Sequence, residues 1–291
     1  MIPRDVQDAL EAALGVAVKD ARAVHGGDIN QAARVTLRDG ATVLLKWNRG
    51  APPDFFTAEA HGLRELAKAG AIRVPEALAV GTTPAYLALE WIEEAQGGID
   101  RNAFAEDFGR AFAALHRVTA PEHGLDRDNY IGAIPQINTP SPSWTTFYRE
   151  RRIGAQMQFA RERGRLPRER EDLLTRLQDW LDVFLDDATM TPSLLHGDLW
   201  GGNYMVGPGA EPVIIDPAVY YGHREADLAM TELFGGFPPR FYAAYDEAYP
   251  LDPGYDQRRE LYQLYHVLNH MNLFGGGYAA RADSIARRYV G

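Results

Sequence analysis

The sequence contains no cysteine, and this absence excludes several kinds of chemistry. Without thiols the chain has no disulfide, no thiolate nucleophile, no cysteine-ligated zinc or iron–sulfur centre and no thiol redox switch. Long apolar runs are lacking as well, because no stretch approaches the roughly 18 consecutive apolar residues of a membrane span. Charged side chains interrupt residues 1–20, which therefore lack the apolar core of a signal peptide. We expect a cytoplasmic protein.

Basic residues are also scarce. The chain carries 30 lysines and arginines against 40 aspartates and glutamates, a formal net charge of −10. Nucleic acids bind to basic surfaces, so we expect neither a nucleic acid nor a membrane as a partner. Glutamates interrupt the arginine-rich stretch 161–170, which we interpret as a solvated helix–turn–helix surface. An acidic chain is still compatible with ATP, because Mg²⁺ and a few local donors suffice for the phosphates.

The first part of the chain, residues 1–92, has the pattern of a small sheet with helices. Asp39-Gly40 lies between two apolar runs and is a strong signal for a tight hairpin turn. A helix is expected to begin after Pro52-Pro53-Asp54 and to end at Gly70, because apolar residues recur between them at helical spacing. An amphipathic helix is expected over 6–14. Strands are expected over 35–38, 41–47, 71–80 and 85–92.

The remainder, residues 93–291, has a mainly helical pattern. Phe104, Phe108 and Phe112 recur at helical spacing and predict a core helix over 103–117. At 291 residues the chain is long enough for two lobes with a sizeable core. We therefore predict an α+β, bilobal protein with a small, sheet-rich N-terminal lobe and a larger, mainly helical C-terminal lobe. The other expected features are a long loop over 121–143, helices over 145–163 and 168–187, a strand-and-loop island over 193–216, and helices from there to the C-terminus.

Three polar residues with a distinctive spacing lie in this island. Asp198 precedes Asn203 by five positions, and Asp216 follows the apolar run 213–215. Phosphoryl transfer needs one carboxylate that accepts the proton of the attacking hydroxyl, and an amide oxygen and a second carboxylate that hold Mg²⁺. The spacing resembles that of the protein-kinase catalytic loop. We interpret Asp198 as the catalytic base and Asn203 and Asp216 as Mg²⁺ ligands; a turn whose side chains only cap the backbone is the alternative.

The N-terminal lobe provides a check on this interpretation. A kinase needs a strand lysine that contacts the α- and β-phosphates of ATP, and a helix glutamate that holds this lysine. Lys46 ends the second hairpin strand, and Glu59 lies on the apolar face of the following helix. A glutamate on an inward face needs a partner, so we predict a Lys46–Glu59 ion pair. A snorkelling lysine and a glutamate at the helix rim are the alternatives.

Further predictions about the ATP site follow from position alone. Gly26 and Gly27 precede the hairpin and are candidates for a loop that covers the phosphates, although an ordinary turn explains them nearly as well. Glu90, Trp91 and Ile92 end the last strand, just before the second lobe. Their backbone is placed where it could hydrogen-bond to the adenine.

Other polar and aromatic residues are assigned supporting roles. We expect His196 and Asp227 to hold the catalytic loop by hydrogen bonds. Trp200 follows Asp198 closely, and its ring is a candidate platform for the apolar face of a sugar; simple packing of the loop is the alternative. His266 and His270 are four residues apart on a predicted helix, but without a third ligand we interpret them as core or surface histidines.

The stretch 196–203, which reads HGDLWGGN, resembles the signature of the fructosamine kinase (ketosamine-3-kinase) family. His-Gly-Asp alone also occurs in aminoglycoside phosphotransferases and choline kinases, whereas the continuation Leu-Trp-Gly-Gly-Asn is more specific. The resemblance extends over nearly the whole chain. The other matching segments are 26–30, 55–60, 124–132, 215–218, 220–227 and 232–237.

This resemblance implies a protein-kinase-like fold and ATP-dependent phosphorylation of the 3-hydroxyl of a ketoamine. Ketoamines form when a reducing sugar glycates an amine, often a lysine side chain, and the phosphorylated product falls apart to release the amine. The implied role is deglycation, with a ribulosamine, erythrulosamine or fructosamine as substrate, on a small molecule or a protein. Some family members dimerise through a cysteine near the glycine-rich loop, where this chain has Asp28. We therefore expect a monomer or a weak dimer without a disulfide.

Three alternatives stay open. The chain could be another small-molecule kinase of the same fold, acting on an aminoglycoside or choline. A nucleotide-binding pseudokinase is less compatible with the sequence, because the lysine, asparagine and aspartates of a working site are all present. A metal-dependent hydrolase built on the island leaves Lys46 and Glu59 unexplained. We assign no role to His223, Arg224 and Glu225, which we expect to line the approach to the site.

Overall fold

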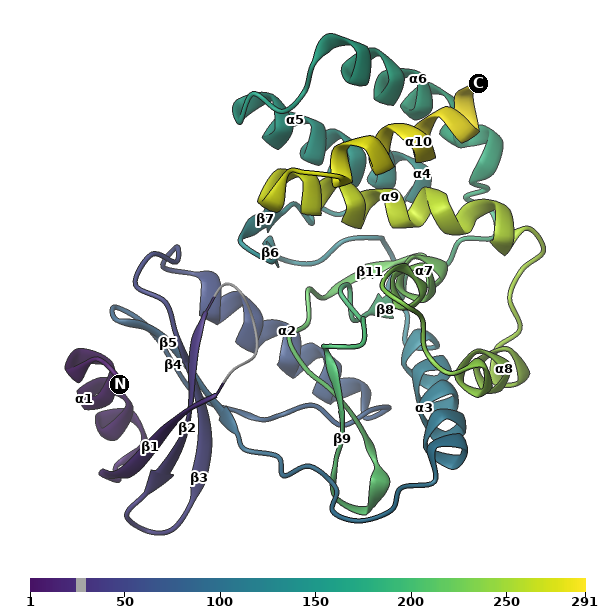
Figure 1. Ribbon diagram of the computed structural model, residues 1–291. Helices are drawn as coiled ribbons and strands as arrows, with labels where there is room; N and C mark the ends of the chain where they lie inside the picture. The colour runs from purple at the N-terminus through teal and green to yellow at the C-terminus, as the bar shows by residue number, and fades with distance from the viewer. Residues whose placement is uncertain (25–29) are drawn as a thin grey trace.

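A five-stranded antiparallel sheet forms the centre of the N-terminal part of the chain (Figure 1). The structure is a computed structural model and describes residues 1–24 and 30–291. The strand order is β1-β2-β3-β5-β4, so β3 lies in the middle of the sheet. The strands are β1 (Val18–Val24), β2 (Gln31–Leu37), β3 (Thr42–Trp47), β4 (Ala77–Thr82) and β5 (Ala85–Glu90).

Two helices cover opposite faces of this sheet. α1 (Arg4–Leu14) packs in one apolar cluster with the sheet, and α2 (Phe55–Ala69) packs in another. Successive residues of a strand point to opposite faces. Leu45 of β3 accordingly lies in the α1 cluster, whereas Leu44 packs against the α2 cluster. Alternation therefore places Lys46 on the face that α2 covers.

The edge strand β1 is absent from the sequence predictions. Its residues between Val18 and Val24 are exposed, so the strand shows no alternation of apolar and polar side chains. It pairs with β2 through the backbone, which places little demand on side chains.

Several predicted element boundaries are wrong. The strand expected over 85–92 ends at Glu90, and the strand expected over 35–38 begins at Gln31. The strand expected over 71–80 begins only at Ala77. Pro75 lies in the intervening segment and lacks the N–H that a strand ladder requires. The loop expected over 121–143 contains a short hairpin. Its strands are β6 (Asn129–Ile131) and β7 (Ile134–Gln136).

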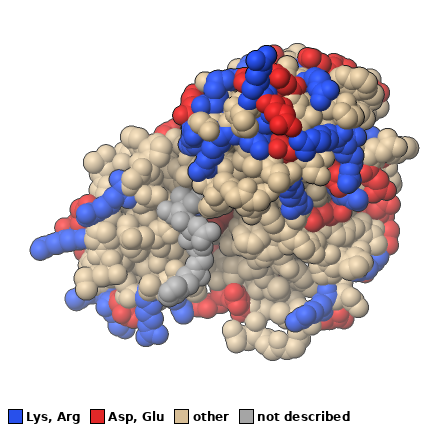
Figure 2. Space-filling model, turned by 45° about the horizontal axis from the view of Figure 1, so that its top comes forward, with Lys and Arg blue, Asp and Glu red and all other residues tan. Residues whose placement is uncertain are grey.

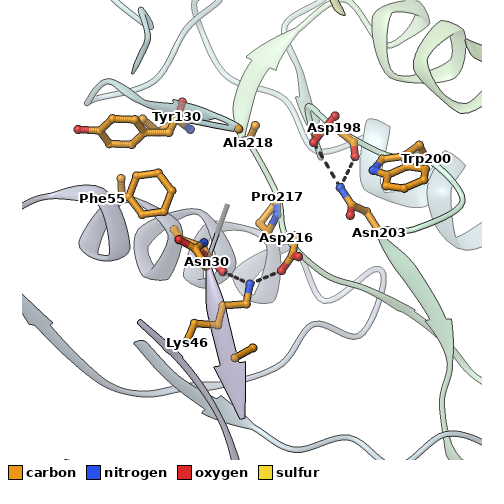
Figure 3. Close-up of a pocket in the computed structure, with 15 residues that line it drawn as sticks. Asn30, Lys46, Phe55, Tyr130, Asp198, Trp200, Asn203, Asp216, Pro217 and Ala218 are labelled. Carbon is orange, nitrogen blue, oxygen red and sulfur yellow. Dashed lines mark hydrogen bonds and ion pairs between the residues drawn. The ribbon is translucent and has the colours of Figure 1, made fainter. Parts of the chain in front are cut away.

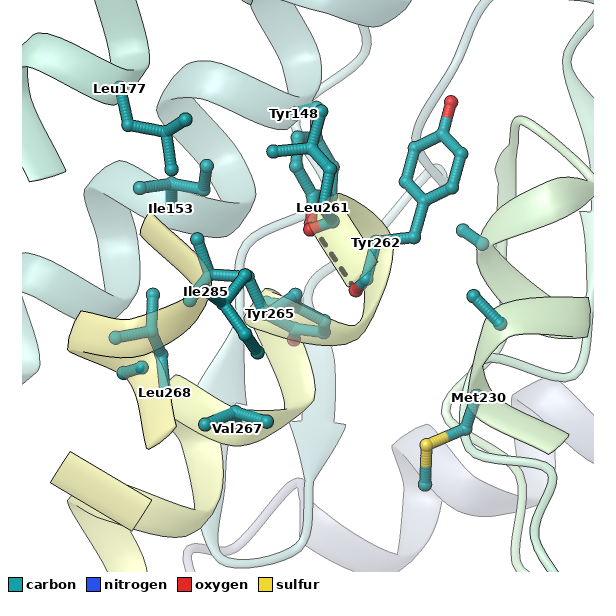
Figure 4. Close-up of a cluster of buried hydrophobic side chains, with 14 of the residues drawn as sticks. Tyr148, Ile153, Leu177, Met230, Leu261, Tyr262, Tyr265, Val267, Leu268 and Ile285 are labelled. Atoms are coloured by element: carbon teal, nitrogen blue, oxygen red, sulfur yellow. Dashed lines mark hydrogen bonds between the residues drawn. The ribbon is translucent and has the colours of Figure 1, made fainter. Parts of the chain in front are cut away.

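The C-terminal part of the chain is built around α9, which contacts α7 and α10. Figure 4 shows the buried side chains of this core, where the Tyr148 hydroxyl donates a 2.6 Å hydrogen bond to the Leu261 carbonyl. A π-helical stretch (Tyr148–Gly154) interrupts the predicted helix 145–163. The helices are α3 (Arg101–His116), α4 (Trp144–Phe147), α5 (Ala155–Glu162), α6 (Arg168–Phe184), α7 (Glu225–Leu233), α8 (Pro239–Ala248), α9 (Tyr255–Phe274) and α10 (Tyr278–Val290).

Charged side chains on the upper part of the molecule are mixed in sign (Figure 2). In the arginine-rich stretch between α5 and α6, Arg161 pairs with Glu171 at 2.5 Å and Arg170 pairs with Asp283 at 2.7 Å. Among the helices that the structure describes, none combines the length and apolar character that a membrane span requires.

Short strand pairs hold the island between α6 and α7. They place Asp216 next to Lys46 of the sheet. The division into lobes at residues 92 and 93 stays a prediction. The island strands are β8 (Ser193–Leu195) paired with β11 (Tyr220–Gly222), and β9 (Tyr204–Val206) paired with β10 (Pro212–Ile214).

Candidate active site

Lys46 of β3 contacts carboxylates of both α2 and the island. Its Nζ donates a hydrogen bond to Glu59 Oε1 at 2.7 Å, and it also donates to Asp216 Oδ1 (Figure 3). The predicted ion pair between Lys46 and Glu59 is therefore present. Burial opposes the charged ammonium, but the charges of Asp216 and Glu59 outweigh this effect and raise the pKa of Lys46. The lysine is a fixed cation at the base of the cleft.

The loop that contains Asp198 begins at a tight turn after β8. The carboxylate of Asp227, on α7, accepts hydrogen bonds from the backbone N–H groups of His196 at 2.7 Å and Gly197 at 2.8 Å. His196 Nε2 donates to the Ile215 carbonyl at 2.9 Å. A Cβ on Gly197, whose φ is 83°, would lie only 2.0 Å from the Ala218 carbonyl oxygen. Glycine at this position allows the loop to pack directly on the segment that follows Asp216.

Asp198 and Asn203 face each other across the loop (Figure 3). Asn203 Nδ2 donates to the Asp198 carbonyl at 2.8 Å and to Asp198 Oδ2 at 3.3 Å. Burial, together with the negative charges of Asp216 and Asp227, raises the pKa of Asp198 well above its usual range, although the contact with Asn203 opposes this shift. A carboxylate with raised pKa is a stronger base than an ordinary aspartate.

The residues proposed to hold Mg²⁺ fit a hard cation. Asn203 Oδ1 and Asp216 Oδ2 accept no hydrogen bond from the residues that the structure describes, so both oxygens are free for a metal. Oxygen donors of this kind are what Mg²⁺ requires. Asp216 has a φ of 55°, an unusual value for a residue other than glycine. Such a backbone conformation is typical of residues held in place for function.

One cavity brings the predicted residues of both regions together (Figure 3). Trp200 also lines it, with 41% of its surface exposed. Phe55 and Tyr130 belong to the wall as well, with ring centroids 4.8 Å apart, and sequence reasoning missed both. No role was assigned to either residue, although both lie in segments that carry the family resemblance, 55–60 and 124–132, and Tyr130 also lies in the long loop expected over 121–143. Other lining residues are Asn30, Ala32, Lys46, Ala58, Glu59, Asn129, Gly132, Asp198, Asn203, Asp216, Pro217 and Ala218.

The residues predicted to contact adenine lie outside this cavity lining. The Glu90 N–H donates to the Glu76 carbonyl at 2.9 Å, and the Glu90 carboxylate pairs with Arg73 at 2.6 Å. Trp91 and Ile92 make no backbone hydrogen bond with the described residues. Their contact with adenine stays a prediction. Gly26 and Gly27 lie outside the described residues.

We expected His223, Arg224 and Glu225 to line the approach to the site, and this expectation is wrong. All three are buried and hold α7 against its neighbours. His223 Nδ1 lies 2.7 Å from the Tyr262 hydroxyl. Arg224 donates to the Tyr249 carbonyl at 2.8 Å, and the Glu225 carboxylate pairs with Arg258. Their role in this structure is packing.

The two histidines on α9 do not form a metal pair. His270 Nδ1 donates to the His266 carbonyl at 2.8 Å, which is a contact within the helix. His266 is buried, and its Nδ1 lies 3.9 Å from Asp198 Oδ1. Its position beside the proposed base was not predicted.

The geometry agrees with what comparisons with known proteins show. Residues 3–291 match the fructosamine kinase family. A probable ketoamine kinase of Synechocystis sp. is 43% identical over 276 residues, which cover 93% of this chain and 90% of the relative. A chloroplastic protein-ribulosamine 3-kinase of Arabidopsis thaliana is 40% identical over 272 residues, which cover 92% of this chain and 81% of the relative.

The fold of this chain is also similar to that of solved structures. The crystal structure of a Thermobifida fusca protein assigned as a fructosamine-3-kinase superposes with a TM-score of 0.86 at 35% identity, covering 98% of each chain. The predicted α+β, bilobal, protein-kinase-like fold is thereby confirmed. Both the sequence match and the fold extend over nearly the whole chain, and the chain therefore belongs to the fructosamine kinase family.

Proposed function

We propose that this chain is an ATP-dependent ketoamine kinase, which transfers the γ-phosphoryl group of ATP to the 3-hydroxyl of a ketosamine and so initiates deglycation. The observation that carries the proposal is the convergence of Lys46, Asp198, Asn203 and Asp216 on one cavity. Relatives that match nearly the whole chain are named as ketoamine kinases and ribulosamine kinases, which supports this substrate class over an aminoglycoside or choline.

In the proposed reaction Asp198 orients the acceptor hydroxyl and takes its proton as the oxygen attacks the γ-phosphorus. The bond between the γ-phosphorus and the bridging oxygen breaks, so that the products are a sugar phosphate, ADP and a proton on Asp198. Asn203 and Asp216 would hold Mg²⁺, which offsets the negative charge of the phosphates when it is bound. Glu59 keeps Lys46 in place, and Lys46 contacts the phosphates.

The surroundings of the transfer site have roles in the same proposal. The backbone of residues 90–92 would bind the adenine at the boundary between lobes 1–92 and 93–291, and Gly26-Gly27 would cover the phosphates. Trp200 is exposed at the cavity wall and would stack on the apolar face of the sugar. ATP as the donor favours a cytoplasmic location. We expect a monomer or weak dimer, which cannot be disulfide-linked because the chain has no cysteine.

The substrate assignment is tested by ADP release with ribulose-lysine, erythrulose-lysine and fructose-lysine, with kanamycin and choline as competing acceptors. We expect turnover with at least one ketoamine and a phosphate on its 3-oxygen, read by ³¹P–¹H NMR. If only kanamycin or choline is phosphorylated, the ketoamine is wrong as the substrate class, but the assignment as a kinase stands. If the protein binds ATP but phosphorylates none of these acceptors, the result favours the alternative of a nucleotide-binding pseudokinase.

Replacing Lys46 by methionine should weaken the use of ATP. Methionine keeps the length and most of the volume of the side chain but removes the charge that faces Glu59 and Asp216. A hydrogen bond to a charged group contributes about 1.5–3 kcal/mol, which corresponds to an increase of roughly 10- to 100-fold in the KM for ATP. Steady-state kinetics with ATP varied at saturating ketoamine measure this KM. Lys68→Met, on the exposed side of α2, is the matched control and should leave the KM unchanged. An equal change in both variants would argue against the assigned role.

A further inference from the structure

His266 is a buried histidine that the reaction described above does not use. It lies on α9 with only 4% of its surface exposed. Its Nδ1 has no hydrogen-bond partner among the residues that the structure describes, and it lies 3.9 Å from Asp198 Oδ1. A buried polar nitrogen without a partner is costly to the folded state, and such atoms in native proteins call for an explanation.

The surroundings of the ring keep it neutral. Burial, reinforced by His270 and Arg152, lowers the pKa of His266 to about 3, whereas the charge of Asp227 acts in the opposite direction. A neutral imidazole carries a proton on one nitrogen only. Because Nδ1 faces the oxygen of a carboxylate, the tautomer with the proton on Nδ1 is favoured: a lone pair there would repel Asp198.

We propose that His266 is a positioning residue for the catalytic base, whose Nδ1–H donates a hydrogen bond to Asp198 Oδ1 in the complex with nucleotide and acceptor. The proposal rests on the proposed function, in which Asp198 is the base. A movement of about 1 Å closes the observed gap to an ordinary N–H···O distance. Catalytic hydrogen bonds are often long or poorly aligned until the reacting complex forms.

With this contact, both oxygens of the Asp198 carboxylate would accept a hydrogen bond. Asn203 Nδ2 already donates to Oδ2 from one side, at 3.3 Å. A second donor at Oδ1 fixes the rotation of the carboxylate and leaves its remaining lone pairs directed into the cavity, where the acceptor hydroxyl must arrive. Because His266 is not among the residues that line the cavity, it acts through Asp198 and does not contact the substrate.

Three variants distinguish positioning from packing. His266→Phe keeps a ring beside Tyr265 but has no nitrogen, and we expect turnover to fall about 10-fold with both KM values changed by less than about 2-fold. His266→Asn places its Nδ2 near the position of the histidine Nδ1 and should recover most of the turnover. His266→Gln places its amide near Nε2 instead and serves as the matched control, which should not recover it. Thermal unfolding shows whether each variant folds.

A measurement independent of turnover uses protein with ¹⁵N-labelled histidine. We expect the ring spectrum of wild type to show the proton of His266 on Nδ1, and this proton to move downfield when ADP, Mg²⁺ and a ketoamine are added. In Asp198→Ala the downfield movement should be absent.

The outcomes separate the two proposals. If wild type does not phosphorylate any ketoamine, the proposed function fails, whereas the spectrum of the protein alone still shows whether the His266 proton is on Nδ1, the nitrogen that faces Asp198. If wild type is active but the phenylalanine variant keeps full turnover, or asparagine recovers no more than glutamine does, the role of His266 is refuted. A proton found on Nε2 in the complex would also refute it.

Discussion

Replacing Asp198 by asparagine should lower the turnover of a ketoamine by about 1,000-fold, because general-base catalysis contributes about 10²- to 10⁴-fold. The amide has nearly the shape of the carboxylate and can keep the contact with Asn203, but it cannot accept the hydroxyl proton at neutral pH. ATP binding should change little, since Lys46 and Asp216 are untouched. Coupled ADP release measures the turnover, and calorimetric titration with ATP and Mg²⁺ measures the affinity.

The same variant should be more stable than wild type in the absence of metal, and this second result excludes misfolding as the cause of inactivity. The pKa of Asp198 is raised in the folded state, so the folded protein holds this proton more tightly than the unfolded chain does. Its stabilising contribution is present below the unfolded pKa and is lost as the pH rises through the folded pKa. At pH values above the unfolded pKa, Asp198 therefore destabilises the fold, and asparagine removes this cost.

The melting temperature of Asp198→Asn should exceed that of wild type at pH 7 in buffer with a metal chelator, and this difference should shrink as the pH is lowered. Inactivity with a lower melting temperature would point to structural damage. Turnover within about 10-fold of wild type would contradict the assignment of Asp198 as the base.

The sequence was most informative where function depends on local spacing. Asp198 and Asn203 lie on one loop, and their spacing, together with Asp216 after an apolar run, predicted a phosphoryl-transfer site. The pair of Lys46 and Glu59 could also be predicted, because strand alternation and helix periodicity each direct one side chain to the interior, and a buried charge needs a partner. Lys46 in addition contacts Asp216, which no local pattern indicates.

The features that sequence reasoning missed depend on contacts between distant segments. His266 is one of two histidines on the same helix, and only the packing of α9 against the catalytic loop determines which of them faces Asp198. Tyr130 reaches the cavity because a short hairpin forms within an apparently irregular segment, and three-residue strands leave too few positions for a periodic pattern. Edge strand β1 is exposed and lacks alternation altogether.

Lys46 has two carboxylate partners, which differ in exposure. The Glu59 side chain is 12% exposed, whereas the Asp216 side chain is 41% exposed. Glu59 can therefore keep the buried lysine paired when Asp216 turns to another ligand. In the proposed function this arrangement lets Asp216 hold Mg²⁺ while Lys46, still paired with Glu59, contacts the phosphates.

Replacing Asp227 by alanine should destabilise the protein by about 3–5 kcal/mol, the cost of breaking a buried polar arrangement by removing one partner. The carboxylate is only 2% exposed and accepts hydrogen bonds from two backbone N–H groups, at His196 and Gly197. His116 Nε2 lies 3.3 Å from the same carboxylate. Alanine leaves these donors buried without an acceptor, and it frees the turn that precedes Asp198. Urea unfolding at pH 7 measures the loss.

The pH dependence of this effect has a definite sign. Burial favours the protonated acid, but hydrogen bonds and charge from His116, with the N–H groups of the loop, outweigh it and lower the pKa of Asp227. The stabilisation is therefore present above the unfolded pKa of about 3.9 and is lost as the pH falls through the folded value. The difference between wild type and Asp227→Ala should be constant near neutral pH and should narrow only in acid. Asp227→Asn keeps one acceptor oxygen and should lose about 1–3 kcal/mol. An alanine variant within about 1 kcal/mol of wild type would show that the loop does not depend on Asp227.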